Sequence, residues 1–535
     1  MTTRNKHFDV LIIGAGFSGL YMLIKARELG LSVKVIEAGG DVGGTWYWNR
    51  YPGARCDVES IEYSYEFDEE LQQEWDWSER YATQPEILRY INHVAERFDL
   101  RSDIQFDTRV TGAHFNAEAH QWSVEMENGQ TCTAQFLVAA SGPLSVPLKP
   151  KFPGQDQFQG DIYYTGYWPH EGVDFTGQRV AVIGTGSSAV QSIPLIAEQA
   201  DSLTVYQRTP AYVVPAHNRP LSTEERTSVK ADYATLRTRA KEMHFALGAK
   251  YIQEETLMAE HSLEQRKSRL EKAWAVGGFI FLYAYADIMF DPATNHEVAE
   301  FIRGKIASVV KDPAIASILM SRGVVGSKRL CVGTNYYETY NRDNVSLVDI
   351  NEFPLQGFTA VGIETPAGER PYDAIVSATG FDAMTGALTR IDIRGVNGDT
   401  LKQRWSEGAD TYLGLQVSGF PNLFIVAAGP GSSTAFTNVI KSTEHHVEWI
   451  GDCIIHMRET GKHTVEAEPA AESAWVEHVQ EVANTTLFPQ EKSFYNGANV
   501  PGKARVYLPY VAGFPVYVQK CKDVASNGYE GFKLT

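Results

Sequence analysis

The sequence predicts an α/β protein with two nested Rossmann-like dinucleotide-binding domains and a helical insertion. An apolar strand running into a glycine-rich turn occurs twice, at 8–19 and again at 180–189. Each turn is followed by a helical stretch and a further strand, which is the order of a βαβ unit. Between 222 and about 320 the pattern changes to charged helices with apolar stripes, so helices interrupt the second unit.

The strands expected in the two units alternate with helices, as a parallel sheet requires. The remaining strands are expected at 32–37, 122–126 and 136–140 in the first unit, and at 202–208, 345–348 and 374–377 in the second. Within the insertion, helical patterns are clearest at 263–274 and 297–310. The first dinucleotide-binding domain is predicted at 1–143 with 381–535, and the second at 144–220 with 325–380. The helical insertion is predicted at 221–324.

The composition is that of a folded chain without a basic surface. Of 535 residues, 43% are hydrophobic, and 66 acidic against 48 basic side chains give a net charge of −18. This balance argues against a disordered chain. It also argues against nucleic acid or an anionic membrane as a partner, because both attract basic surfaces. The longest strongly apolar run, 273–286, is shorter than the roughly 18 residues of a membrane span, and we expect it to be a buried helix.

The five cysteines lie far apart and include no CxxC pair. A disulfide scaffold, a zinc ribbon and a dithiol redox centre are therefore not expected. The neighbours His445 and His446 match no metal-binding spacing, so we expect no metal site. The first strand begins without a cleavable leader before it, and we expect a cytoplasmic protein. The sequence leaves the oligomeric state open, and a monomer is compatible with it.

The first glycine turn has the spacing GxGxxG, formed by Gly14, Gly16 and Gly19. The first glycine permits the turn, the second lets a pyrophosphate approach the backbone, and the third lets the helix pack closely. Glu37 ends the next strand, where a carboxylate can accept hydrogen bonds from both ribose hydroxyls. This combination indicates a dinucleotide without a 2′-phosphate.

The second glycine turn is not followed by an acidic residue. Its next strand ends in Arg208 and Thr209, which can pair with and donate to a 2′-phosphate that a carboxylate would repel. One site that ends in an acid and one that ends in arginine together indicate FAD and NADPH. The spacing alone leaves open that Glu37 and Arg208 are solvated surface side chains.

With these two glycine turns, the chain resembles the Baeyer–Villiger monooxygenases, which are flavoproteins that insert an oxygen atom beside a ketone carbonyl. The resemblance covers nearly the whole chain and is strongest for the branch that acts on phenylacetone, steroid and cyclic ketones. The family fingerprint F-x-G-x-x-x-H-x-x-x-W, followed by Pro or Asp, corresponds to 158–169. Tyr164 stands where the family has histidine and cannot carry an imidazolium charge. The matching positions are Phe158, Gly160, Trp168 and Pro169.

Two further segments carry the resemblance. The aromatic-rich loop 43–57 matches throughout and ends on Asp57, and 326–330 contains Lys328 and Arg329. The resemblance implies that Arg329 reaches the flavin and that Lys328 helps to hold the 2′-phosphate. Near the C-terminus, Phe494 stands where the family commonly has tryptophan, and it lacks the indole N–H that can contact the nicotinamide nucleotide. Without the resemblance, these aromatic and basic residues would pass for core and surface positions.

The resemblance implies two catalytic residues, Arg329 and Asp57, and two cofactors, FAD and NADPH. The residues expected to bind FAD are Gly14, Gly16, Phe17, Ser18, Gly19, Glu37, Thr45, Trp46, Asp57 and Tyr63. Those expected to bind NADP are Arg55, Gly184, Thr185, Gly186, Ser187, Ser188, Gln191, Arg208, Thr209, Lys328 and Arg329.

The implied reaction converts a ketone and O₂ to an ester or lactone through a C4a-peroxyflavin, with cyclic, aryl or bulky ketones as the substrate class. A cation at Arg329 would stabilise the negative charge on the reacting oxygens, and Asp57 would orient it. Two alternatives remain at this point. One is an FAD/NADPH oxygenase of amines or sulfides, and the other is a non-oxygenating NADPH-dependent flavoprotein. The sequence does not indicate which ketone is used.

Overall fold

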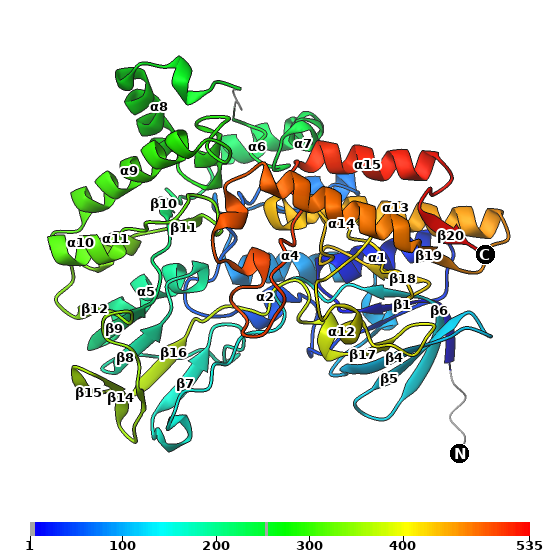
Figure 1. Ribbon diagram of the computed structural model, residues 1–535, viewed down its shortest axis with the longest axis horizontal. Helices are drawn as coiled ribbons and strands as arrows, with labels where there is room; N and C mark the ends of the chain where they lie inside the picture. Colours follow the sequence, from blue (N-terminus) through cyan, green and yellow to red (C-terminus); the bar gives the residue numbers. More distant parts are fainter. Residues whose placement is uncertain (1–5, 252–254) are drawn as a thin grey trace.

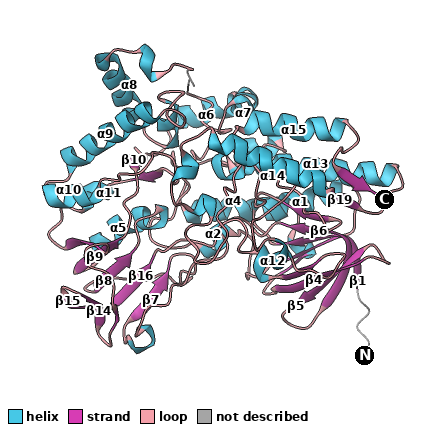
Figure 2. Cartoon of the chain, in the orientation of Figure 1, coloured by secondary structure: helices cyan, strands magenta, loops and turns pink. Residues whose placement is uncertain are grey.

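Two β-sheets lie side by side with helices packed above them in the computed structural model, which describes residues 6–251 and 255–535 (Figure 1). The larger sheet and the C-terminal helices form one side of the molecule. The smaller sheet and the helical insertion form the other (Figure 2). Strands of the larger sheet come from both ends of the described chain, and strands of the smaller sheet come from both sides of the insertion.

The larger sheet has eight strands among the described residues, in the order β17-β4-β5-β6-β1-β2-β3, with β18 also paired to β6. β1, β2, β3, β6 and β18 run parallel, and β4 and β5 add an antiparallel meander. Near-continuous burial along the carboxyl half of β1 is typical of a parallel strand covered on both faces. The strand bounds are Lys6–Ile13 (β1), Val33–Ile36 (β2), Ile104–Gln105 (β3), Val110–Asn116 (β4), Gln121–Met126 (β5), Thr131–Ala139 (β6), Asp392–Arg394 (β17) and Leu423–Ile425 (β18).

The smaller sheet is parallel throughout, in the order β12-β9-β8-β16-β7. Its central strands are short apolar runs with almost every residue buried, as the crossover helices require. A three-stranded antiparallel sheet of β13, β14 and β15 adjoins it. The bounds are Asp161–Tyr164 (β7), Arg179–Ile183 (β8), Ser202–Gln207 (β9), Val345–Asp349 (β12), Gly357–Phe358 (β13), Gly362–Thr365 (β14), Gly368–Pro371 (β15) and Ala374–Ser377 (β16).

The insertion enters and leaves the smaller unit through a short parallel ladder between β10 and β11. This ladder fixes the chain just after Arg329, because the Cys331 amide donates to the Tyr212 carbonyl. The helices begin at residues that suit helix N-termini: Ser222 and Ser262 form capping boxes, and Asp291 accepts from the Thr294 amide. The bounds are Val213–Pro215 (β10), Cys331–Gly333 (β11), Thr223–Ala231 (α6), Tyr233–Glu242 (α7), Leu263–Val276 (α8), Pro292–Val309 (α9) and Pro313–Leu319 (α10).

The apolar run 273–286 is not one buried helix, and that prediction was wrong. Helix α8 ends at Val276, and Gly277 and Gly278 follow with φ of +68° and +76°. A Cβ on Gly278 would overlap the hydroxyl of Tyr81, so the tertiary packing needs glycine there. The chain then continues as the short 3₁₀ turn Phe279–Tyr283. Four of its five side chains are nevertheless buried, those of Phe279, Phe281, Leu282 and Tyr283.

The other helices cover the faces of the two sheets. α1 and α13 pack together over the larger sheet, and α5 packs on the smaller one. Within the part of the chain that the structure describes, no helix combines the length and apolarity needed to cross a bilayer. The bounds are Phe17–Glu28 (α1), Thr45–Trp48 (α2), Glu69–Glu74 (α3), Gln84–Arg97 (α4), Ser187–Gln199 (α5), Tyr336–Thr339 (α11), Leu401–Arg404 (α12), Val439–Glu459 (α13), Pro469–Asn484 (α14) and Phe514–Ser526 (α15). The last two strands, Val465–Ala467 (β19) and Phe532–Leu534 (β20), pair antiparallel.

Candidate active site

The first glycine turn is packed so closely that it excludes side chains. Gly14 has φ of +103°, and a Cβ there would lie 2.7 Å from the Ala140 carbonyl oxygen at the end of β6. A Cβ on Gly19 would overlap the Gly14 carbonyl, so helix α1 rests directly on the turn. None of the described side chains caps the N-terminus of α1. Its first amides are therefore free to face an anionic ligand.

The turn also brings polar groups to the same edge of the sheet. The Glu37 carboxylate is buried and accepts the amides of Ala15 and Gly39, each at 2.6 Å. Burial raises the pKa of Glu37, and the two amide donors act against that rise. Each carboxylate oxygen keeps a lone pair for a further donor. The buried Ser141 hydroxyl, whose Cα lies near Gly14, has no hydrogen-bond partner among the described residues.

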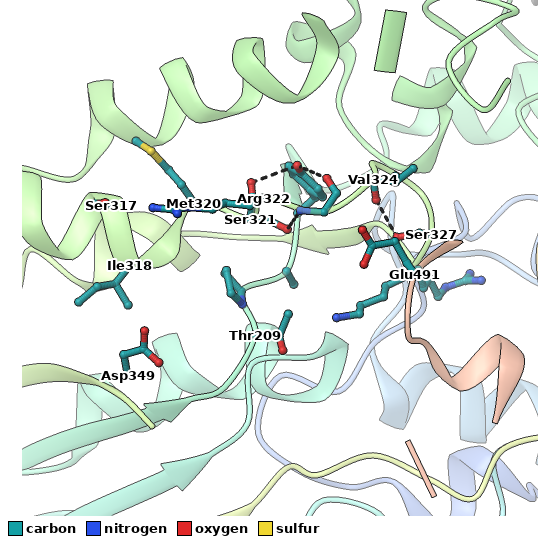
Figure 3. A pocket seen from close by; sticks show the side chains of 16 residues that line it. Thr209, Ser317, Ile318, Met320, Ser321, Arg322, Val324, Ser327, Asp349 and Glu491 are labelled. Atoms are coloured by element: carbon teal, nitrogen blue, oxygen red, sulfur yellow. Dashed lines mark hydrogen bonds between the residues drawn. The ribbon is translucent and has the colours of Figure 1, made fainter. Parts of the chain in front are cut away.

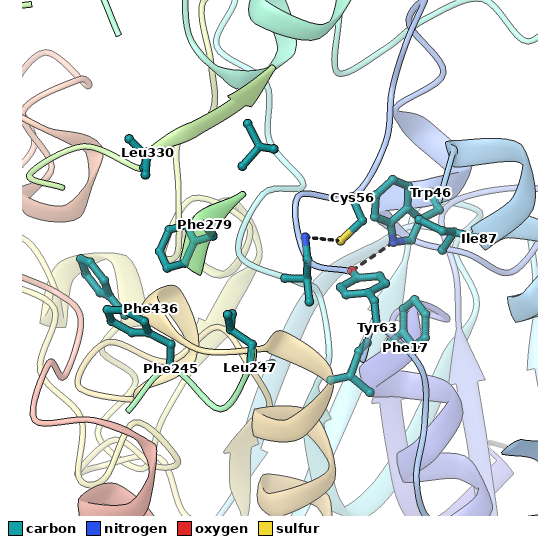
Figure 4. Packing of buried hydrophobic residues seen from close by; sticks show 14 of the residues in the cluster. Phe17, Trp46, Cys56, Tyr63, Ile87, Phe245, Leu247, Phe279, Leu330 and Phe436 are labelled. Atoms are coloured by element: carbon teal, nitrogen blue, oxygen red, sulfur yellow. Dashed lines mark hydrogen bonds between the residues drawn. The ribbon is translucent and has the colours of Figure 1, made fainter. Parts of the chain in front are cut away.

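An aromatic group stands next to this turn (Figure 4). The Trp46 indole N–H donates to the Tyr63 hydroxyl at 3.2 Å, and the Phe17 ring meets the Tyr63 ring edge-on with centroids 5.4 Å apart. Gly44 begins the short helix α2 with φ of +52°, and a Cβ there would lie 2.9 Å from the Cα of Gly16. The loop and the glycine turn thus face each other backbone to backbone, a cradle that side chains would fill.

Ser18 and Thr45 are the other two residues expected at the flavin. The Ser18 hydroxyl hydrogen-bonds Thr443 on α13 at 3.0 Å, so it faces the helix packing. Thr45 is exposed at the start of α2. Only the backbone of Ser18 remains available to a ligand at the turn.

Arg329 and Asp57 form a two-point ion pair between the segment that follows the insertion and the aromatic loop. The Nε of Arg329 donates to one carboxylate oxygen at 2.6 Å, and Nη2 donates to the other at 2.7 Å. The side chains keep 27% and 18% of their surface exposed, so the pair is partly accessible. Burial disfavours the charge on Arg329, but the attraction of Asp57 outweighs it and raises the pKa of Arg329. The guanidinium is therefore a permanent cation.

Three groups that sequence reasoning did not assign surround this cation. The guanidinium lies over the Phe279 ring at 5.2 Å from its centroid, and Nη1 donates to the Ala435 carbonyl at 3.5 Å. Tyr495 is buried, and its hydroxyl is close enough to Arg329 to interact with the charge of the guanidinium. Burial raises the pKa of Tyr495 to about 12, and Arg329 opposes that rise. The sequence signals for these groups were an aromatic run within the insertion, a glycine-rich loop that contains Ala435 and the altered residue next to Tyr495.

The second glycine turn resembles the first in its backbone conformation, but there is more open space beside it. Gly184 has φ of +114°, and a Cβ there would overlap the Ala378 carbonyl. A Cβ on Gly186 would meet no atom of the described residues within 4 Å. The Thr185 hydroxyl donates to the Thr209 carbonyl at 3.0 Å, and Ser187 and Ser188 open helix α5, which no described side chain caps. This turn therefore presents an open cradle above free amides.

A cavity of about 440 Å³ runs from the end of β9 to Arg329 (Figure 3). Thr209 and Lys328 line it, and Arg208 is close enough to disfavour the charge on Lys328. Burial lowers the pKa of Lys328, Glu491 works against that fall, and Arg208 adds to it. The other lining residues are Pro210, Ala211, Tyr212, Ser317, Ile318, Met320, Ser321, Arg322, Gly323, Val324, Ser327, Asp349 and Glu491.

Gln191 and Arg55 do not face this cavity. The Gln191 amide accepts from the Tyr51 hydroxyl at 2.9 Å and donates to the Arg55 carbonyl at 3.1 Å. The Arg55 side chain pairs with Glu79 at 3.4 Å. In this structure the Gln191 side chain, which binds Tyr51 and the Arg55 backbone, holds helix α5 against the aromatic loop.

The family fingerprint forms the edge of the smaller sheet. A Cβ on Gly160 would overlap the Asp373 carbonyl, and Trp168 is buried. Tyr164, which replaces the family histidine, accepts a hydrogen bond from Gln155 at 3.0 Å. The Lys149 ammonium lies 5.1 Å from its ring centroid. The Lys149 ammonium thus places a positive charge beside Tyr164, which is itself uncharged.

The cysteines and histidines form no second centre. The five cysteines, all within the described ranges, are free thiols. His446 is buried and accepts the Ala427 amide at its Nδ1, so its Nε2–H donates to Tyr517. Among the described residues no group of three His, Cys, Asp or Glu side chains could hold a metal ion.

Comparisons with known proteins bear on this geometry. A family model described as pyridine nucleotide-disulphide oxidoreductase matches residues 11–279. The chain is 44% identical to the Baeyer–Villiger monooxygenase of Pseudooceanicola batsensis over 531 residues, which cover 98% of this chain and 96% of that relative. It is also 41% identical to the phenazine N-monooxygenase of Lysobacter antibioticus, over 99% of this chain and 97% of the relative.

Solved structures agree over nearly the whole chain. The oxidised steroid monooxygenase bound to NADP has a TM-score of 0.94 at 47% identity, with 99% of each chain covered. The OTEMO complex with FAD and NADP has a TM-score of 0.95 at 40% identity, with 99% of this chain and 100% of that chain covered. The predicted α/β fold with two dinucleotide-binding units is confirmed, and the chain belongs to the Baeyer–Villiger monooxygenase family.

Proposed function

We propose that this NADPH-dependent flavin monooxygenase converts ketones to esters or lactones. One ketone, one O₂, one NADPH and one proton give one ester, one water and one NADP⁺. The observation that carries the proposal is the two-point ion pair of Arg329 and Asp57. It holds a permanent cation between the first glycine turn and the cavity that leads to the second.

FAD is the proposed occupant of the first turn, within a domain formed by 1–143 and 381–535. The free amides of α1 suit a pyrophosphate, and the Glu37 carboxylate keeps lone pairs for ribose hydroxyls. The cradle of Gly16 and Gly44 and the unpartnered Ser141 hydroxyl fit a flat ligand that approaches the backbone. FAD supplies the redox and oxygen chemistry when it is bound.

NADPH is the proposed occupant of the second turn, within a domain formed by 144–220 and 325–380, with 221–324 as the insertion. The open space above Gly186 suits a pyrophosphate. Arg208, Thr209 and Lys328 would hold the 2′-phosphate. Gln191 and Arg55 support the cradle from behind in this account, because the Gln191 side chain binds Tyr51 and the Arg55 backbone in the aromatic loop.

The chain's own contribution to the chemistry is electrostatic. Negative charge develops first on the attacking oxygen and then on the former carbonyl oxygen, and a fixed cation lowers the energy of both. Asp57 keeps Arg329 in one orientation, so little reorganisation accompanies the reaction. Removing one preorganised donor of this kind typically costs roughly 3–4 kcal/mol. The Phe279 ring covers one face of the guanidinium.

A second candidate reaction is the oxygenation of a nitrogen or sulfur atom. The likeness to a phenazine N-monooxygenase favours it, because that relative is as similar as several of the ketone enzymes. The two reactions differ in the oxygen species that they need. A heteroatom lone pair attacks oxygen without building negative charge on a carbonyl, so a cation beside the carbonyl favours the ketone reaction. A cytoplasmic location and O₂ as co-substrate belong to this proposal as well.

The test is a product assay with the FAD-loaded protein, NADPH and ¹⁸O₂. Linear, cyclic, aryl and steroidal ketones are compared with a thioether and an aromatic amine. The proposal expects an ester or lactone that carries one ¹⁸O atom, formed in proportion to the NADPH consumed. Sulfoxide or N-oxide without ester, or NADPH consumption without O₂ uptake, would overturn it.

A further inference from the structure

The cavity at the proposed 2′-phosphate site contains a carboxylate that forms no hydrogen bond or ion pair with the described residues. Glu491 lines the cavity together with Lys328 and Ser327 (Figure 3). A Cβ on Gly323 would lie 3.3 Å from its Oε1, so the carboxylate rests against that backbone. Within the described ranges, the Glu491 carboxylate makes no hydrogen bond or ion pair, and neither does the Lys328 ammonium.

The second acidic residue of the cavity is placed differently. Both amide groups of Asn351 donate to one oxygen of Asp349, at 2.9 Å from the backbone and 2.7 Å from the side chain. Asp349 is therefore held in a turn at the end of β12. Glu491 belongs instead to the segment after α14, in which Phe488 stacks on Phe436 and Tyr495 reaches Arg329. Its carboxylate is the acidic group that an anion at Lys328 would meet.

The charges at this end of the cavity determine how the Glu491 carboxylate affects phosphate binding. Arg208, Lys328 and Arg322 attract a phosphate at this end of the cavity, whereas Glu491 and Asp349 repel it. Two unit charges about 4 Å apart interact by about 1 kcal/mol even in water, and by more in a partly buried cleft. A phosphate carries nearly two charges, so a nearby carboxylate weakens its binding measurably. A nucleotide without the 2′-phosphate escapes this penalty.

We propose that Glu491 is a specificity-determining residue that opposes the 2′-phosphate at Lys328 and thereby keeps the binding of phosphorylated nucleotide weaker than the basic residues alone would make it. The inference rests on the proposed function, which places that phosphate beside Lys328. Glu491 sits on the same segment as Tyr495, so the repulsion acts between the nucleotide and the segment that contacts Arg329. Looser binding favours release of NADP⁺ at the end of a turnover.

The test measures binding of two matched probes to the FAD-loaded protein by calorimetry. Adenosine 2′,5′-bisphosphate carries the 2′-phosphate, and adenosine 5′-monophosphate lacks it. For Glu491→Gln we expect the bisphosphate to bind on the order of fivefold more tightly, with the monophosphate unchanged. High salt should shrink the difference, because it screens the repulsion. Glu481→Gln, an exposed glutamate on α14, is the matched control and should change neither probe.

Two results would overturn the inference. One is an unchanged or weaker affinity of Glu491→Gln for the bisphosphate, and the other is an equal gain for both probes. If Glu491→Gln folds poorly, as its melting temperature would reveal, Glu491→Asp should give an intermediate gain. Lys328→Met separates this inference from the proposed function: selective loss of bisphosphate affinity supports the phosphate site. An unchanged discrimination by Lys328→Met would contradict the proposed site itself.

Discussion

The guanidinium of Arg329 and the carboxylate of Asp57 meet in a two-point ion pair, although 272 positions separate them in the chain. Asp57 ends the aromatic loop that follows the first glycine turn, and Arg329 follows the insertion. The pair therefore joins these two segments of the fold at one point. Its geometry fixes where the cation lies, which is the property that an oxyanion-stabilising group needs.

Asp57→Asn keeps the shape of the side chain and removes its charge. We expect kcat for ester formation to fall roughly 10- to 100-fold, as for other groups that orient a catalytic cation or ligand, with a much smaller change in KM for NADPH. Steady-state kinetics on a ketone substrate measures both constants. Asp373→Asn is the control, because Asp373 binds Arg179 with the same two-point geometry at an exposed place on the smaller sheet. An equal loss in both variants would contradict a role for the Arg329 pair.

Tyr495→Phe removes the hydroxyl that contacts Arg329 and keeps the ring that packs on Phe436. The hydroxyl interacts with the Arg329 cation, so we expect ester formed per NADPH to fall several-fold while NADPH still reduces the flavin at the normal rate. Stopped-flow reduction and product analysis separate the two. Equal slowing of both steps would indicate a general packing defect. Tyr507→Phe, which loses a hydroxyl without a hydrogen-bond partner among the described residues, is the matched control.

Gly186→Ala probes the second cradle without disturbing the fold. The backbone of Gly186 is compatible with alanine, and a Cβ would meet no described atom within 4 Å. We expect an unchanged melting temperature but a KM for NADPH about tenfold higher, since overpacking a bound ligand costs ~1–3 kcal/mol. Gly304→Ala on α9, where a Cβ also finds open space, should leave KM alone. Normal NADPH binding by Gly186→Ala would contradict the proposal that the pyrophosphate binds at this turn.

Acid should destabilise the protein through His446. Burial lowers the pKa of His446 well below its ordinary value, so the folded state holds it neutral. The unfolded chain takes up a proton at about pH 6.5, and stability is therefore full above that pH and lost as pH falls below it. The loss amounts to about 1.4 kcal/mol per pH unit for this group. Melting temperatures between pH 7.5 and 5 should fall less steeply in His446→Gln than in the parent, whereas His296→Gln, exposed on α9, should follow the parent.

Local patterns were sufficient to predict the two glycine turns and the central strands beside them, but not the short strands β3, β17 and β18 or the antiparallel pairing of β4 with β5. Gly14, Gly19 and Gly184 occupy positions where the backbone admits no side chain, so spacing and neighbouring apolar strands identify them. The prediction of a single helix at 273–286 failed because apolar content does not reveal where the chain bends. Its bend at Gly278 depends on Tyr81, a residue far away in the sequence.

The residues of the site could be predicted from the sequence only where they belong to a recognisable motif. Arg329 and Asp57 came from the family resemblance, since neither residue type is informative in a loop. Gln191 and Arg55 were expected at the nucleotide, but the structure pairs Gln191 with Tyr51 and the Arg55 backbone. Tyr495 and Glu491 were not predicted, because their positions depend on how the segment after α14 packs across the cavity.

The central claim is that Arg329 supplies the cation for ketone oxygenation, and Arg329→Ala tests it most directly. The measurement is single-turnover ester formation by the FAD-loaded variant under O₂, with flavin reduction by NADPH recorded in the same sample. We predict that the rate of ester formation falls roughly 10²- to 10³-fold. Some flavin reduction by NADPH should remain. Ester formation near the parent rate in Arg329→Ala would contradict the account.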